Sequence, residues 1–301
     1  MNTAATPINA ALLTVAALAA ALQFIAFPLW VPPTPASIAG LIVLAAVTAP
    51  FSWGLMHESI HAKLFASERA NQLAGRFVGL MLCLDWDVMR FGHLMHHRAN
   101  RHDLDRPEDY KNGQSRLAAA PGYYITLLGG GSLKAAMGAI AAFLPVAATE
   151  RIVAGMFGDE VSPLRDAALR AFTDPQRRAR MRVDFTATLA LIALSAWLWG
   201  ALWPVLLACI LVRFAMLSIL DNAPHYGTAK NSGAWAFNTT MPRAARWLVL
   251  NGNFHGIHHR SPQLSWLELP RAFEDDCVRF DGSWIAMVLR QFRGPMRVSD
   301  A

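Results

Sequence analysis

The sequence carries little charge for its length. Of its 301 residues only 16% are Asp, Glu, Lys or Arg, whereas 54% are hydrophobic, and the mean hydropathy is +0.29. A soluble domain of this size has about 25% charged residues, so the composition predicts a chain that lies in a bilayer. The net charge of +6 does not indicate a nucleic-acid partner. Lys and Arg are absent before Lys63 and then gather between apolar runs, which is typical of membrane topology.

Cysteine is also scarce. Cys83, Cys209 and Cys277 lie far apart, and no CxxC spacing occurs. This spacing indicates neither a disulfide framework nor a thiolate metal site. Any metal ion would have to be held by other side chains.

Uncharged apolar runs predict four membrane spans, each long enough to cross a hydrocarbon core of about 30 Å. The two hairpin turns, 31–37 and 199–204, contain proline or glycine and no basic residue, whereas the segments between the hairpins are basic. We therefore expect a multi-pass protein of the cytoplasmic (inner) membrane with both termini on the cytoplasmic side. The chain as a whole, 1–301, is predicted to be a single domain. The predicted spans are about 9–30, 36–56, 183–200 and 204–221.

Two segments and one charged residue need a separate prediction of their position relative to the membrane. Residues 123–149 are apolar, but three consecutive glycines and Lys134 interrupt them, which favours an interfacial or re-entrant segment over a span. The basic stretch 165–182 is interpreted as a solvated segment on anionic headgroups rather than a docking site for an acidic partner. Arg213, inside the fourth span, is expected to snorkel; the functional alternative is that it anchors an anionic substrate head.

Histidine is missing from residues 1–56, from 103–224 and after His259, and all ten histidines lie in four clusters. The clusters are HESIH (57–61), HLMHH (93–97) with His102 beyond it, His225 alone, and HGIHH (255–259). Spacings of three and four place the histidines of a cluster on one helix face. Nine convergent imidazoles exceed the roughly six ligands of one ion, so two metal ions are expected. The candidate ligands are His57, His61, His93, His96, His97, His225, His255, His258 and His259.

Two other classes of protein remain as remote alternatives. HESIH also satisfies the HExxH pattern of an intramembrane zinc metalloprotease, with Glu58 as the general base. That interpretation leaves seven clustered histidines without a role. A metal transporter would place its polar ligands near the middle of the bilayer, whereas these lie at one end of the spans. Glu58 is more simply a hydrogen-bond acceptor that orients a histidine ring.

The motifs HESIH, HLMHHRANRHDLDRPEDY, DNAPHYG and NFHGIHHRSPQLSWLELP resemble the histidine boxes of the membrane fatty acid desaturase and hydroxylase superfamily, over roughly residues 50–271. The resemblance implies an all-α integral membrane fold, with a stalk of four transmembrane helices (two hairpins) under a cytoplasmic helical cap. It also implies a non-haem centre of two iron ions held mainly by histidine. His102 and Asp105 match the family's pattern after the second box and are expected to support the ligands. Asp221, four positions before His225, is a possible additional or water-mediated ligand.

The resemblance further implies that O2 is the co-substrate and that an unactivated C–H bond of a lipid or fatty acyl chain is oxidised. We expect desaturation, with a hydroxylase or ketolase of a lipid, alkane or carotenoid as the alternative. The substrate would enter from the bilayer. Because no cytochrome b5-like segment is recognised, electrons are expected from a separate donor of the ferredoxin, rubredoxin or cytochrome type. Imidazole ligands alone do not distinguish iron from zinc or copper.

Overall fold

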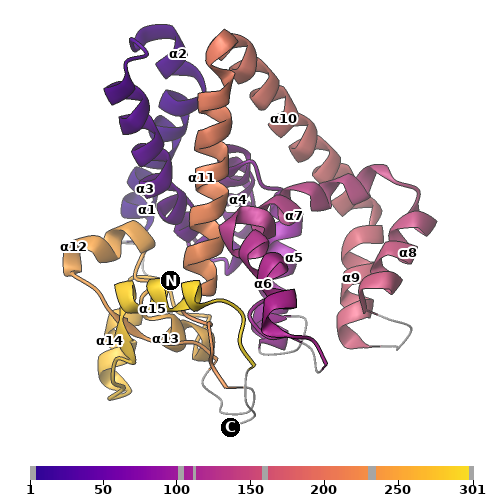
Figure 1. The fold of residues 1–301 in the computed structure, drawn as a ribbon, viewed down its shortest axis with the longest axis vertical. Helices are drawn as coiled ribbons and strands as arrows, with labels where there is room; N and C mark the ends of the chain where they lie inside the picture. The colour runs from indigo at the N-terminus through magenta and orange to yellow at the C-terminus, as the bar shows by residue number, and fades with distance from the viewer. Residues whose placement is uncertain (1–4, 101–104, 111–112, 158–161, 230–234, 298–301) are drawn as a thin grey trace.

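Two pairs of long helices form the upper part of the molecule in Figure 1. In this computed structural model, residues 5–100, 105–110, 113–157, 162–229 and 235–297 are described. The first pair consists of α1 (Ala5–Ala21), which continues through a π turn, η1 (Leu22–Ala26), into α2 (Phe27–Trp30), and of α3 (Pro35–Ile60). Thr34 and Ser37 cap α3 reciprocally, with Pro35 at its first position, so the short proline-rich turn directly restarts a helix.

The second pair is α10 (Pro175–Trp199) and α11 (Trp203–Asn222), joined by a short turn, η5 (Gly200–Leu202). Gly200 has a φ of +50°, which a residue without a side chain adopts readily. Asp174 caps α10 by accepting a hydrogen bond from the Arg177 amide. This cap starts α10 two turns before the predicted span at 183.

Four continuous helical segments are long and apolar enough to cross a membrane: Thr6–Trp30, Pro35–Ile60, Arg116–Phe143 and Pro175–Asn222. The last of these contains both α10 and α11. The predicted all-α membrane fold with two helical hairpins is thereby confirmed. The side of the membrane on which the termini lie, the cytoplasmic position of the cap and the extent of the single domain stay predictions.

The segment from 116 to 143 is bent. It consists of α6 (Arg116–Ile125), a π turn η3 (Thr126–Gly130), α7 (Gly131–Gly138) and a 3-10 turn η4 (Ala139–Phe143). Gly129 has a φ of +110°, and a Cβ there would lie 3.0 Å from the backbone nitrogen of Ala215 on α11. The glycine run therefore allows a sharp bend directly against α11. The interfacial or re-entrant placement of this segment in the bilayer remains a prediction.

Three arginines of the basic run before the second hairpin form hydrogen bonds within the protein. Arg178 is 5% exposed and donates to the backbone oxygens of Ala141 and Phe172 at 3.1 and 3.0 Å. Arg180 forms two 3.0 Å hydrogen bonds with the Asp87 carboxylate, and Arg182 donates to a backbone oxygen of η4 at 2.7 Å. The predicted solvated stretch is thus wrong for Arg178, which is buried, whereas Arg180 and Arg182 keep contact with solvent. All three hold the bent segment and α5 against α10.

Arg213 does not snorkel, contrary to the prediction. Its side chain is 3% exposed, donates from Nη1 to the Met81 backbone oxygen at 2.7 Å, and lies 4.7 Å from the centre of the Phe24 ring. Met81 belongs to the last turn of α4, where backbone oxygens lack helical partners. Arg213 therefore joins α11 to the end of α4 inside the helix bundle.

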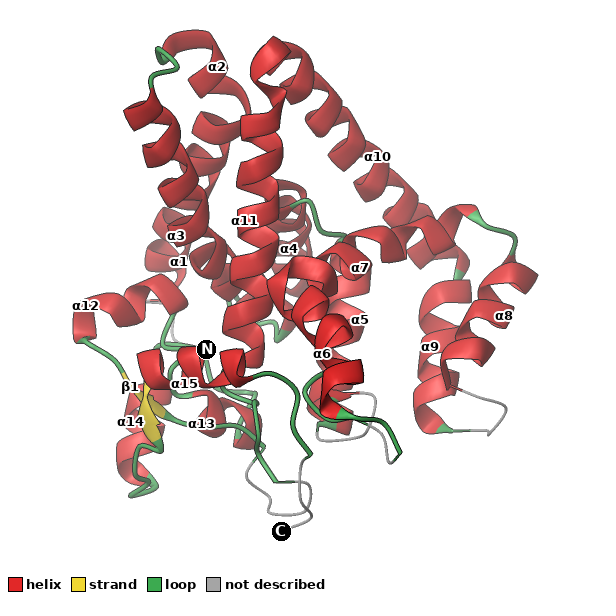
Figure 2. Ribbon diagram, in the orientation of Figure 1, coloured by secondary structure: helices red, strands yellow, loops and turns green. Residues whose placement is uncertain are grey.

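The remaining elements lie below and beside the long helices (Figures 1 and 2). Trp266, in the C-terminal part, is 2% exposed; its indole nitrogen donates to Asn9 Oδ1 and its backbone nitrogen to Glu58 Oε2, both at 3.0 Å. These bonds fix the C-terminal part onto the first hairpin. The other helices are α4 (Glu68–Leu82), α5 (Trp86–Ala99), α8 (Val146–Phe157), α9 (Pro163–Thr173), α12 (Arg243–Arg246), η6 (Trp247–Val249), α13 (His255–Arg260), α14 (Leu269–Asp275), α15 (Trp284–Arg290) and η7 (Gln291–Arg293). A two-residue parallel pair joins β1 (Thr239–Thr240) to β2 (Gly282–Ser283).

Candidate metal centre

The nine candidate histidines converge where α3 and α11 end, against α5 and α13. His57 and His61 close α3, and the second cluster lies on α5, whose start is capped by Asp85. His225 follows α11 within a turn, and the third cluster forms α13. Because α3 and α11 run side by side through the bundle (Figure 1), residues 168 positions apart in sequence, His57 and His225, meet at one end of it.

Five histidines make up the first group: His57, His61, His93, His97 and His258. Their ring nitrogens lie within 4.8 Å of one another. The Nε2 atom of His93 is 2.9 Å from that of His61 and 3.1 Å from that of His97, and His97 and His258 are 3.0 Å apart at Nε2. Nε2 of His57 is buried and has no hydrogen-bond partner among the described residues.

Four histidines make up the second group: His96, His225, His255 and His259. Here Nε2 of His96 is 3.1 Å from that of His225 and 3.2 Å from that of His259, and His255 lies 3.0 Å from His225. The two groups are neighbours, since the rings of His97 and His259 stack with centroids 4.3 Å apart. Together they form one continuous cluster with two focal points.

These distances fit metal ligation. A metal–imidazole bond is about 2.0–2.1 Å long, so two ligands at right angles around one ion have their nitrogens about 3.0 Å apart. Burial lowers the pKa of His61, His93 and His255, and repulsion from neighbouring histidines lowers it further. The rings are therefore uncharged at neutral pH, which is the form that binds a metal. The buried, unpartnered Nε2 of His57 is an atom that such an ion would satisfy.

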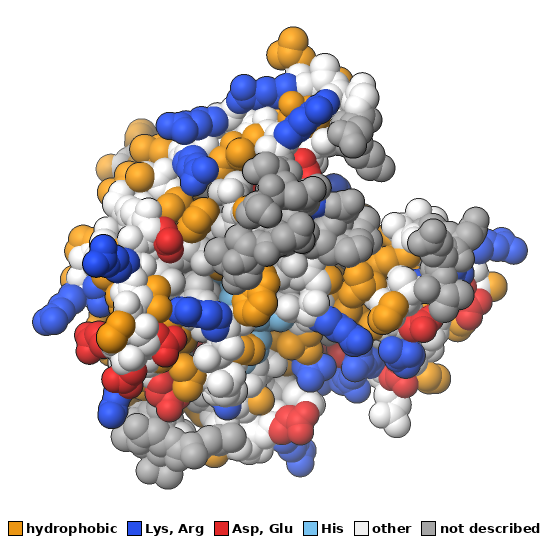
Figure 3. Space-filling view, turned by 90° about the horizontal axis from the view of Figure 1, so that it is seen from below, with side chains coloured by type: hydrophobic (Ala, Val, Ile, Leu, Met, Phe, Trp, Pro, Cys, Tyr) orange, Lys and Arg blue, Asp and Glu red, His pale blue; other side chains and the backbone are white. Residues whose placement is uncertain are grey.

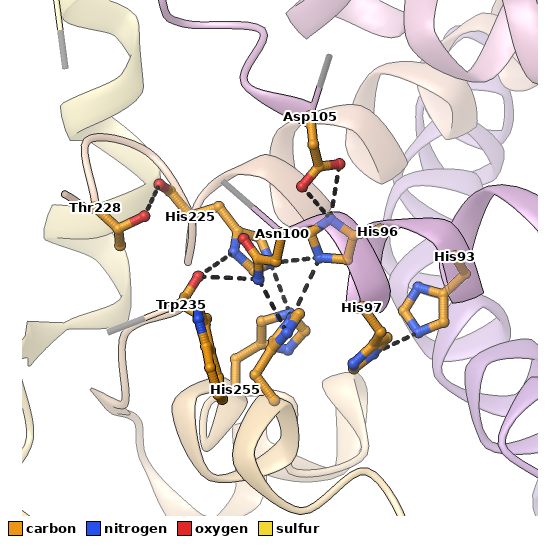
Figure 4. A network of polar contacts seen from close by, with 10 residues as sticks. His93, His96, His97, Asn100, Asp105, His225, Thr228, Trp235 and His255 are labelled. Atoms are coloured by element: carbon orange, nitrogen blue, oxygen red, sulfur yellow. Dashed lines mark hydrogen bonds and ion pairs between the residues drawn. The ribbon is translucent and has the colours of Figure 1, made fainter. Parts of the chain in front are cut away.

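Contacts at the opposite ring nitrogen orient several of the histidines (Figure 4). Nδ1 of His96 donates to both oxygens of Asp105, at 2.9 and 3.0 Å. Nδ1 of His225 donates to the Trp235 backbone oxygen at 2.8 Å, and the Asn100 amide lies 3.0 Å from Nδ1 of His259. A proton held on Nδ1 of His96 and His225 places the lone pair of each ring on Nε2, which points at the focal point.

The other predicted supporting residues differ in their placement. Glu58 is 3% exposed; one oxygen lies 3.6 Å from Nδ1 of His57 and the other accepts from the Trp266 amide. Asp221 is accessible and faces a cavity. His102 lies outside the described residues. Asn100 and Trp235 were not predicted as supporting residues.

A cavity of about 680 Å³ opens beside the second group. At one end it is lined by His96, His225 and Asp221, and it extends between α11 and the bent segment 116–143 as far as Lys134. A smaller cavity of about 60 Å³ touches His57, His255 and His258, and so borders both groups. Trp53 and Asp221 line both cavities. Arg213, for which anchoring a substrate head was the functional alternative, lines neither of them.

The fold and the cluster define a mostly helical membrane protein with two adjacent groups of histidines that could hold metal ions. The model of the fatty acid desaturase family matches residues 28–286. The chain belongs to the fatty acid desaturase family and is therefore an oxidoreductase of the type that acts on lipids. No individual curated protein matches it.

Proposed function

We propose that this protein is an O2-dependent lipid desaturase, in which the two histidine groups hold two iron ions next to the acyl chain. The observation that carries the proposal is the convergence of nine imidazoles on two focal points, the second of which lies at the wall of a cavity of about 680 Å³ through His96 and His225. Cavities of about 300–1,000 Å³ are typical of sites that bind small molecules. The histidines are the proposed ligands; Glu58, Asp105 and Asp221 support or supplement them, as does His102.

Iron bound here would supply the reduction of O2 and the oxidising power for an unactivated C–H bond, chemistry that amino-acid side chains lack. The chain's own residues contribute position. Asp105 and the Trp235 carbonyl fix the rings of His96 and His225, and the cavity wall at Asp221 determines which carbon of the substrate lies closest to them.

In desaturation, O2 takes two hydrogens from neighbouring carbons together with two electrons and two protons, and leaves as two waters. In hydroxylation one oxygen atom enters the substrate and only one water is formed. Both reactions consume two external electrons, so we propose a separate donor of the ferredoxin, rubredoxin or cytochrome type. Desaturation is our primary proposal, and a hydroxylase or ketolase of a lipid, alkane or carotenoid is the alternative product chemistry.

Two features argue against the other classes. The protease would need Glu58 as a water-accessible base, but this carboxylate is 3% exposed and accepts the Trp266 amide. A transporter would need its ligands on a path through the bilayer, whereas the histidines gather at one end of α3 and α11. We further propose that this end faces the cytoplasm from an inner membrane, since the segments between the hairpins are basic.

Mass spectrometry of lipids from cells that express the protein tests the proposal. Desaturation predicts products lighter by two hydrogens, about 2 Da, and hydroxylation products heavier by one oxygen, about 16 Da. A His258→Ala variant should form neither product, and Asp275→Asn, at an exposed carboxylate on α14, is the matched control that should keep wild-type activity. Peptide cleavage, or lipids unchanged by a metal-loaded wild-type protein supplied with reductant, would refute the proposed activity.

A further inference from the structure

A second large recess lies away from the histidines, between α5, the end of α9 and the start of α10. Its volume is about 600 Å³. Arg90 of α5, Arg170 of α9 and Arg177 of α10 line it together. We call this recess the arginine cleft. It is independent of the proposed function, because none of the candidate ligands lines it.

Five of the six arginines in the basic run 165–182 thus divide into two sets. Arg178, Arg180 and Arg182 donate hydrogen bonds to backbone oxygens and to Asp87. Arg170 and Arg177 instead face the cleft, where Arg90 joins them from a helix 80 positions earlier in the chain. Arg90 joins Arg170 and Arg177 because α5 packs against α9. The sequence of the basic run 165–182 therefore does not predict this group of three arginines.

The charges in the arginine cleft are unbalanced. Among the described residues, no carboxylate forms an ion pair with Arg90, Arg170 or Arg177. Asp174 is the one acidic residue of the lining, and its Oδ1 already accepts the Arg177 amide at 2.8 Å. Three guanidinium groups against one engaged carboxylate favour an anionic ligand, and a planar guanidinium matches phosphate oxygens in pairs.

The rest of the lining is apolar. Phe91, Leu94 and Met95 of α5 and Ala171 of α9 contribute to the walls, and the Phe91 ring packs edge-on against Phe172 at 5.2 Å. A ligand that fits this recess has a charged group and a hydrophobic portion. Free phosphate would leave the apolar walls unused.

The position in the fold points to the source of such a ligand. Arg177 lies six residues before Val183, where the apolar part of α10 begins, which is about 9 Å along a helix. The cleft is therefore at the depth of the lipid headgroups if α10 spans the bilayer. Figure 3 shows the lower face of the molecule, where Lys and Arg side chains lie at several places together with Asp and Glu.

We propose that the arginine cleft binds the phosphate of an anionic phospholipid, with the start of its acyl chain on the apolar wall. An acidic protein partner fits less well, because a stable protein interface needs about 800 Å² from each partner, whereas the cleft is a recess of small-molecule size. A bound lipid would bridge α5 and α9. Since α5 carries His93, His96 and His97, the lipid would stabilise the helix that supplies three candidate ligands.

The test uses the full-length, metal-loaded protein in nanodiscs of phosphatidylcholine alone or mixed with phosphatidylglycerol, with retained lipid measured by native mass spectrometry. The wild-type protein should retain phosphatidylglycerol selectively and melt at a higher temperature in its presence. The double variant Arg170→Gln/Arg177→Gln should bind this lipid about thirty-fold more weakly. The charge-matched control Arg271→Gln/Arg279→Gln, on the exposed surface around α14, should bind it as the wild type does.

Each other outcome overturns the proposal. A wild-type protein that retains phosphatidylglycerol and phosphatidylcholine equally would refute it. Equal retention of phosphatidylglycerol by the cleft variant and the control would also refute it. Protection by inorganic phosphate without lipid selectivity would identify a free anion as the ligand. A loss of reductant-driven turnover in the cleft variant, with unchanged lipid retention, would identify an acidic protein partner. If the double variant does not fold, Arg170→Gln alone, at an exposed position on α9, provides the same comparison.

Discussion

Replacing Asp105 by Asn should weaken one of the two metal sites selectively. The Asp105 carboxylate accepts the Nδ1 proton of His96 at both oxygens, at 2.9 and 3.0 Å, and His96 belongs to the four-histidine group. An amide keeps the size of the side chain but loses the negative charge that raises the basicity of the ring. Loss of such a partner typically lowers metal affinity about 10- to 100-fold, which is about 1.4–2.8 kcal/mol.

The assay is an anaerobic titration of the metal-free protein with ferrous ion against a competing chelator. The wild-type protein should bind two ions, and in Asp105→Asn one binding step should weaken by the stated factor while the other stays unchanged. Asp275→Asn, which alters an exposed carboxylate on α14, should leave both steps as they are. If both steps weakened equally, or neither changed, the assignment of His96 to a separate group would be wrong.

Three further predictions concern the surroundings of the ligands. Gly256→Ala should lower metal content without removing a ligand, because a Cβ there would lie 2.6 Å from the Ala236 backbone oxygen and displace α13; a metal content equal to that of the wild type contradicts this. Arg213→Met should leave substrate affinity unchanged in a steady-state assay, since this buried side chain lines neither cavity, and a raised KM at normal metal content would restore its proposed anchoring role. The metal-free protein should lose stability below about pH 6.5, because burial holds the pKa of His93 and His258 well below that value in the folded state while the unfolded chain takes up protons. The slope is about 1.4 kcal/mol per pH unit for each excluded proton, and a melting temperature constant between pH 7 and 5 would contradict it.

The long-range elements of the fold follow directly from the sequence. Apolar length and the distribution of Lys and Arg predicted both hairpins, because these signals depend on the bilayer and not on tertiary contacts. The placement of charged side chains within the bundle was not predictable in this way. Whether the side chain of Arg178 or Arg213 faces lipid, water or a backbone oxygen depends on which helix end packs against it in the folded protein. In both cases that is the end of a helical segment distant in sequence, whose backbone oxygens accept the arginine.

The candidate ligands were recognisable because spacings of three and four place histidines on one face of a helix whatever surrounds it. Their division into a group of five and a group of four could not be recognised from the sequence, since neighbours such as His96 and His97 belong to different groups. Asn100 follows the second box directly and could have been considered from that position. The Trp235 carbonyl carries no signal in the sequence, because any residue type supplies the same acceptor.

The metal content of the purified wild-type protein tests the central claim most directly. Elemental analysis of protein isolated from iron-replete cells, combined with an accurate protein concentration, gives the number of ions per chain. Two separate histidine groups predict two iron ions per chain. A single ion, no tightly bound metal, or zinc in place of iron would contradict the proposed centre.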